Sequence, residues 1–136
     1  MSVPSHLLDT NICSYLMRGK PAQVAERLLA MGSSRVAVSV ITAIELREGV
    51  ELSPQPEKFH RRIGDFLSEV KTLPLETGMA EIAARLRARL RRHGNPIGDL
   101  DTLIAAHALH LGMTLVTNNV REFARVPELT LENWAE

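Results

Sequence analysis

The chain has 136 residues, of which 45% are apolar or tyrosine, and its 16 basic and 16 acidic side chains give a net charge of zero. This size and composition predict one compact domain spanning residues 1–136, with enough apolar side chains for a buried core. Zero net charge disfavours a uniformly basic nucleic-acid binder, so an anionic partner has to be met by a local patch. Cys13 is the only cysteine, which excludes intramolecular disulfides and cysteine-ligated metal clusters. Short apolar runs and the absence of a signal-peptide core predict a cytoplasmic protein with no membrane partner.

Short apolar runs alternate with helical patterns along the chain. In chain order we expect a strand ending at Asp9, helices at about 11–18 and 22–31, a strand at 35–40, helices at 41–50 and 57–69, a strand at 70–75, helices at 77–92 and 100–111, and strands at 114–117 and 129–131. Thr77 is expected to cap the helix at 77–92. The alternation predicts an α/β sandwich around a mainly parallel sheet.

Four polar side chains from separate segments are expected at the carboxyl edge of this sheet, where open α/β sheets bind ligands. Asp9 ends the first strand, and Glu45 lies one turn into the helix that leaves the second strand. Asp101 opens the helix that precedes the strand at 114–117, and Asn119 follows that strand. The topology therefore brings three carboxylates and one amide to one side of one sheet.

Gathered carboxylates repel one another and favour protonation unless a cation lies between them. Oxygen ligands without His or Cys select Mg²⁺ or Mn²⁺ over zinc. Such a site can activate water and stabilise the charge on a phosphodiester during in-line displacement. The acids thus predict metal-dependent hydrolysis without a protein nucleophile.

Each candidate also has a structural interpretation. Asp9 can serve as a helix N-cap, Glu45 as a solvated helix residue and Asn119 as a turn residue. Asp99 is favoured as the N-cap of the helix that contains Asp101, with its carboxylate accepting backbone amides.

Two threonines and two histidines lie close to these acids in the sequence. Thr42 and Thr117 can hydrogen-bond either to acidic side chains or to their own backbone. His107 and His110, on an apolar helix, are expected to be packed and hydrogen-bonded rather than catalytic.

The basic side chains concentrate on the helix expected at 77–92, which carries Arg85, Arg87, Arg89, Arg91 and Arg92. A rotation of about 100° per residue places Arg85, Arg89 and Arg92 on one side of its apolar stripe and the other two on the opposite side. They form either a solvated rim over the core or a surface for RNA phosphates or an acidic partner segment.

Four motifs in order resemble those of PIN-domain ribonucleases, and most closely the VapC toxins of type II toxin–antitoxin modules. The motifs are LLDTN at 7–11, SVITAIEL at 39–46, PIGDLDTLIAAHA at 96–108 and VTNNVREF at 116–123. The resemblance extends over essentially the whole chain. It implies a PIN-like three-layer α/β/α sandwich and a magnesium-dependent endoribonuclease, with manganese as an alternative ion. It also implies inhibition by a VapB-type antitoxin, a homodimer and a structured RNA substrate such as tRNA.

The resemblance also assigns roles to residues. Asp9 and Glu45 match metal-ligand acids of the family, and Asp101 rather than Asp99 matches the later acid because it precedes the Ile-Ala-Ala run. Asn119 stands where many PIN proteins carry a further Asp, which favours an orienting or water-mediated role.

Two other functions remain open at this point. A haloacid-dehalogenase-like phosphatase also places an Asp after its first strand, but that chemistry needs a second Asp where this chain has Asn11. A catalytically inactive PIN-like binding module is the other alternative, against which the three retained acids argue.

Overall fold

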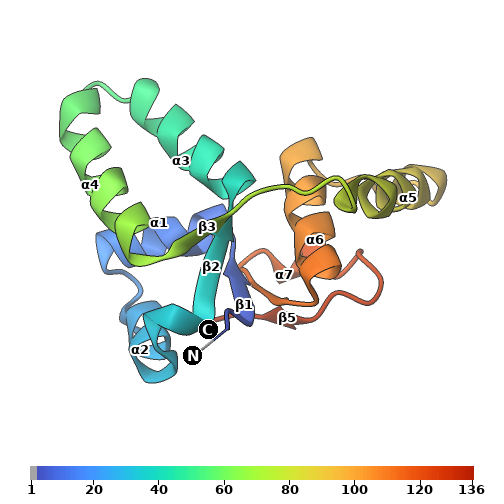
Figure 1. Ribbon diagram of the computed structural model, residues 1–136, viewed down its shortest axis with the longest axis horizontal. Coiled ribbons are helices and arrows are strands. Elements are labelled where there is room, and N and C mark those ends of the chain that lie inside the picture. Colours follow the sequence, from blue (N-terminus) through green and yellow to red (C-terminus); the bar gives the residue numbers. More distant parts are fainter. Residues whose placement is uncertain (1–2) are drawn as a thin grey trace.

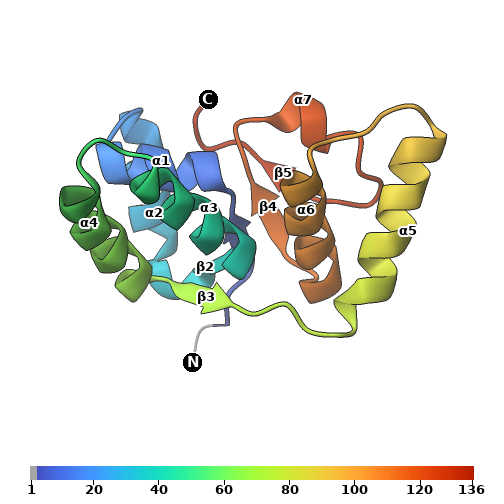
Figure 2. The ribbon, with the colours of Figure 1, turned by 90° about the horizontal axis from the view of Figure 1, so that it is seen from above.

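The computed structural model describes residues 3–136 and centres on a sheet of five parallel strands. The strands are β1 (His6–Leu8), β2 (Val36–Ser39), β3 (Lys71–Leu73), β4 (Thr114–Val116) and β5 (Leu131–Glu132). Their spatial order is β3-β2-β1-β4-β5 (Figures 1 and 2), so the predicted parallel α/β sheet is confirmed. Within residues 3–136, no helix combines the length and the apolar character needed to cross a bilayer.

Six of the seven helices in residues 3–136 fall close to the ranges that the sequence predicts, and the short helix α7 was not predicted. The seven helices are α1 (Thr10–Arg18), α2 (Ala22–Met31), α3 (Val40–Glu51), α4 (Pro56–Glu69), α5 (Met79–Arg92), α6 (Asp99–Leu111) and α7 (Val120–Phe123), with a 3₁₀ turn at Ser33–Arg35. The prediction that Thr77 caps α5 is wrong, because Gly78 holds the N-cap position and no side chain caps the helix. The Thr77 backbone carbonyl accepts a hydrogen bond from the Ala80 amide at 3.1 Å.

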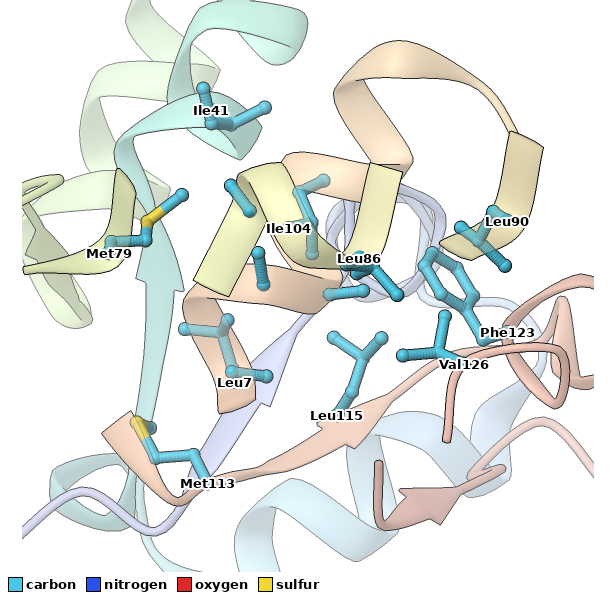
Figure 3. Close-up of a cluster of buried hydrophobic side chains, with 14 of the residues drawn as sticks. Leu7, Ile41, Met79, Leu86, Leu90, Ile104, Met113, Leu115, Phe123 and Val126 are labelled. Atoms are coloured by element: carbon cyan, nitrogen blue, oxygen red, sulfur yellow. The ribbon is translucent and has the colours of Figure 1, made fainter. Parts of the chain in front are cut away.

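Alternate residues of each strand enter two separate cores, because successive side chains of a strand point to opposite faces. Leu7 and Leu115 pack with α5 and α6, and Figure 3 shows them facing Leu86 and Ile104. Their neighbours Leu8 and Val116 belong to the other core, with α1, α2, α3 and α4. Figure 2 shows the two helical layers on opposite sides of the sheet, as expected for an α/β/α sandwich.

Two histidines on α6 are packed, as the sequence predicts. His107 is fully buried and its Nδ1 lies 2.8 Å from Ser39 Oγ. Ser39 Oγ also accepts the Ile41 amide, and the other ring nitrogen of His107, Nε2, is buried without a hydrogen-bond partner among the described residues. Burial lowers the His107 pKa, which keeps the ring neutral. The His110 ring packs against Gly78, because a Cβ added at Gly78 would lie only 3.1 Å from His110 Cε1.

The strand order switches sides at β1: β2 pairs with one edge of β1, and the later strand β4 pairs with its other edge. Such a switch point opens a crevice beyond the carboxyl ends of the strands. The helices α1, α3 and α7 begin directly after β1, β2 and β4, and so they begin at this edge. The fold thereby positions the residues described next.

Candidate active site

Asp9 follows β1 and is 4% exposed. Its Oδ1 accepts the Ile12 amide at 2.9 Å, and the nearby Thr117 hydroxyl and Asn11 backbone favour its charged form. Burial raises the Asp9 pKa to about 6 despite these influences, and the nearby Glu45 carboxylate adds to the rise. Asp9 is therefore both the N-cap of α1 and a buried acid at the sheet edge, so the two interpretations of this residue are compatible.

Glu45 lies on α3 and is held by a neighbour that sequence analysis did not single out. The Thr10 hydroxyl donates to Glu45 Oε1 at 2.6 Å, which links the first turn of α1 to α3. Thr42 Oγ1 lies 3.4 Å from Thr10 Oγ1, so Thr42 supports the threonine and not the carboxylate itself. Because Thr10 directly follows Asp9, the same turn of chain places both acids.

Asp101 is half-buried in the first turn of α6, and its surroundings differ from those of Asp99. Burial raises the Asp101 pKa to about 6, and the charges of Glu122, Glu45 and Asp9 raise it further. The Asp99 carboxylate is 80% exposed and pairs with Arg87 at 3.3 Å.

The predicted capping role of Asp99 is wrong. Gly98 holds the N-cap position of α6 and no side chain caps this helix. At this end of the helix, the backbone amide and the side-chain hydroxyl of Thr102 both donate hydrogen bonds to the Gly98 carbonyl, at 2.8 and 2.9 Å. Asp99, one residue into the helix, is free to turn outward toward Arg87.

Glu122, in the short helix α7, is a fourth acid that sequence analysis missed. Its carboxylate lies close enough to Asp101 to raise the pKa of that acid, and its Oε1 accepts the Gly98 amide at 3.2 Å. Its Oε2 accepts the side-chain amide of Asn119, which fits the expected orienting role of that residue. The sequence did contain a signal for Glu122, since it is an acid three residues after Asn119 and shortly after the strand β4.

Four carboxylates from four segments thus influence one another across the edge of the sheet: Asp9, Glu45, Asp101 and Glu122. Across residues 3–136, the five ion pairs involve none of them. In the same residues, no three His, Cys, Asp or Glu side chains converge closely enough to form a ready-made metal site. Mutual repulsion opposes convergence while no cation balances the charge.

This donor set fits a divalent cation that prefers oxygen. The four candidate ligands are all carboxylates, the set that suits Mg²⁺ or Mn²⁺ and not zinc. An acid as buried as Asp9, without a cationic partner among the described residues, is costly unless it is protonated or binds a cation. Its raised pKa expresses this cost.

The arginines of α5 divide differently from the sequence-based grouping. Arg87, Arg91 and Arg92 line one shallow hollow, whereas the helical wheel put Arg92 with the other two. Arg85 is paired with Glu81 one turn earlier. Arg87 and Arg91 also border the start of α6, next to Asp99. The face that carries these two arginines is therefore the one that meets the start of α6.

Comparison with known proteins supports the same fold and the same family. The family model described as PIN domain matches residues 6–129. The chain is 39% identical to the tRNA(fMet)-specific endonuclease VapC of Salmonella typhimurium over 94% of this chain and 96% of the relative. It is 40% identical to ribonuclease VapC2 of Haemophilus influenzae, over 95% of this chain and 97% of that protein.

Solved structures agree. A DNA-bound VapBC complex from Salmonella typhimurium contains a chain with a TM-score of 0.91 and 38% identity, covering 97% of this chain and 99% of that chain. A promoter-bound VapBC2 complex from Rickettsia felis gives a TM-score of 0.89 at 36% identity, with coverages of 95% and 98%. The fold, the family model and these relatives show that the chain belongs to the PIN-domain family and, within it, to the VapC family.

Proposed function

We propose that this protein is a metal-dependent endoribonuclease that acts as the toxin of a type II toxin–antitoxin module, with a VapB-type antitoxin as its protein partner. The observation that carries the nuclease proposal is the group of four carboxylates without ion-pair partners among residues 3–136. The names of the VapC relatives and the VapBC complexes among the similar structures support the toxin assignment. A homodimer remains a further prediction of this assignment.

The residues of the site divide into ligands and positioning groups. Asp9, Glu45, Asp101 and Glu122 are the candidate ligands of a divalent cation, for which we propose Mg²⁺, with Mn²⁺ as a substitute. When bound, the cation supplies Lewis acidity and offsets the charge that develops on the phosphodiester.

The positioning groups keep each acid in place. The Ile12 backbone amide holds Asp9, the Thr10 hydroxyl holds Glu45, and the Asn119 side-chain amide holds Glu122. None of these three groups brings a charge to the site, so they fix the carboxylates without reducing the negative potential that attracts the cation.

The proposed substrate class is tRNA, and the more specific hypothesis is that the substrate is initiator tRNA. The Salmonella relative is named for action on tRNA(fMet), and this chain covers 96% of it. The hypothesis is tested by incubating the purified protein with total bacterial RNA and Mg²⁺ and sequencing the new fragment ends. Fragments confined to initiator tRNA support it, and ends scattered over many RNAs contradict the more specific hypothesis.

The metal requirement is tested in the same assay. We expect cleavage with Mg²⁺ or Mn²⁺ and none in excess EDTA, because no residue set of the site supplies a metal-free route to hydrolysis. Activity that persists in excess EDTA contradicts the mechanism. A protein that binds RNA but cleaves nothing with either ion is the inactive binding module considered above.

A further inference from the structure

A hollow lies beside the acidic site, between α1, α3 and α4, whose ribbons can be followed in Figure 1. It encloses about 510 Å³, within the range of roughly 300–1,000 Å³ for small-molecule sites. Thr10 and Glu45 form the end that meets the acidic site. The remaining wall is largely apolar and includes Met17, Leu46, Val50, Phe59 and Ile63. We call this space the α1/α3/α4 hollow.

Two arginines border the α1/α3/α4 hollow, and an aromatic ring supports each of them. The Arg18 guanidinium carbon lies 5.3 Å from the centre of the Tyr15 ring, and that of Arg62 lies 5.6 Å from the centre of the Phe59 ring. Among the ion pairs of the described residues, neither arginine has a carboxylate partner. Both guanidinium groups are therefore held in place and remain available to an anion.

These features together match one nucleotide of a single-stranded RNA. Sequence-specific recognition of RNA mostly uses unstacked bases, which enter apolar pockets and stack on aromatic rings or guanidinium planes. The flanking phosphates need cations, and arginine suits their geometry. Continuity with Glu45 matters most, because a group that fills the hollow lies next to the bond being cleaved.

We infer that the α1/α3/α4 hollow binds an unstacked nucleoside of the substrate RNA adjacent to the cleaved bond, with Arg18 and Arg62 contacting the flanking phosphates. The inference rests on the proposed ribonuclease function and adds to it a site that selects the sequence next to the cut. The apolar wall, which includes Phe59, excludes water from the base.

Gly49 offers a direct test, because it lines the hollow and an added Cβ there meets no atom within 4 Å. Gly49→Leu fills the space with a side chain that favours a helix more than glycine does, so the melting temperature should not fall. We expect single-turnover cleavage of initiator tRNA to slow about tenfold, comparable to the loss of one stacked base. Gly64→Leu on α4 is the matched control, because an added Cβ at Gly64 also meets no atom within 4 Å but Gly64 does not line the hollow, so this variant should cleave like the unaltered protein. Equal cleavage by the two variants overturns the inference.

The arginine contact is tested with adjacent positions on α4. Arg62→Gln and Arg61→Gln remove the same charge from neighbouring exposed residues, but only Arg62 lines the hollow. Arg62→Gln should weaken RNA binding and lower the salt dependence of binding by about one phosphate contact, whereas Arg61→Gln should not. Identical salt slopes for the two variants contradict the inference.

Binding is measured by fluorescence anisotropy of labelled initiator tRNA in an Asp101→Asn background, which separates this inference from the proposed function. A protein that cleaves no RNA refutes the function, while the binding comparison still tests the hollow. If Gly49→Leu and Arg62→Gln bind and cleave RNA normally but lose affinity for the VapB-type partner, the hollow serves that protein and the inference is wrong.

Discussion

Asp99 and Asp101 stand two residues apart, yet their carboxylates have opposite surroundings. Asp101 faces three other acids and has its pKa raised to about 6, whereas Asp99 is 80% exposed beside Arg87. Asp101→Asn keeps the shape and removes one charge from the site, so we expect cleavage to slow by about a hundredfold or more. Asp99→Asn should change cleavage little, because it affects only a surface ion pair. Single-turnover kinetics and thermal melting of both variants check this, and the reverse ranking would show that the wrong residue is assigned.

Glu122 gives a second comparison at the same scale. Glu122→Gln removes a candidate ligand but keeps a group able to accept the Gly98 amide. We expect a loss of cleavage similar to that of Asp101→Asn, with folding preserved. Asn119→Ala should lower activity less, because it removes only the amide that orients Glu122. Excess Mn²⁺ should partly restore Asn119→Ala, whose four acids are intact, and should do less for Glu122→Gln.

The sequence could predict a site residue when its position at the end of a strand or the start of a helix was enough to place it at the edge of the sheet. Asp9, Glu45 and Asp101 follow from strand ends and helix starts, and in the structure the charge of Glu45 raises the pKa of both aspartates. The roles of Thr10 and Glu122 depend on which side chain reaches which carboxylate across segments that are distant in sequence. Such contacts form only after the sheet has aligned α1 with α3 and α6 with α7.

On the scale of elements, helix α5 offers two arginine pairs for comparison. Arg87 and Arg91 border the start of α6, whereas Arg85 is paired with Glu81 and Arg89 lies outside the hollows that Arg87 and Arg91 line. Replacing Arg87 and Arg91 with Gln should weaken RNA binding and lower the salt slope by about two units. The same change at Arg85 and Arg89 should leave both unaltered. Titrations over a range of salt concentrations decide between them, and unchanged binding for both pairs would assign α5 to a solvated rim.

The helices and strands themselves were the most predictable level. Long amphipathic segments such as α2 and α4 coincide with their predicted ranges to within a residue, because periodicity over three or four turns is a strong signal. Helix α7 has four residues and no full period to detect. The Asp99 cap was wrong for a related reason, since the choice between Gly98 and Asp99 depends on backbone dihedral angles that the sequence leaves open.

At the scale of the whole molecule, the buried acids couple stability to pH in the metal-free protein. Folded Asp9 and Asp101, each with a pKa of about 6, keep their protons up to about pH 6, whereas the unfolded chain releases them near the ordinary aspartate pKa of 3.8. The folded state therefore binds more protons in this window, and the free energy of unfolding falls as the pH rises from about 4 to 6.

Asp9→Asn isolates this effect, because it keeps an oxygen for the Ile12 amide and removes the charge. In EDTA at pH 7 the variant should be more stable than the unaltered protein by up to about 3 kcal/mol, the equivalent of two pKa units. The difference should vanish near pH 4. Millimolar Mg²⁺ should reverse the order, since only the unaltered protein retains the full ligand set. Melting curves across pH with EDTA or Mg²⁺ test both signs, and equal stability at every pH would contradict the electrostatic account.

The pairing of β1 with β4 has a consequence for how this protein is made. His6 pairs with Thr114, so the central strand waits for a partner that the ribosome delivers only near the end of synthesis. Asp9 emerges early and Glu122 late, and a nascent or prematurely terminated chain lacks a complete set of acids. The central strand gains its second neighbour, and the edge of the sheet gains its fourth acid, only after β4 and α7 have been added to the growing chain.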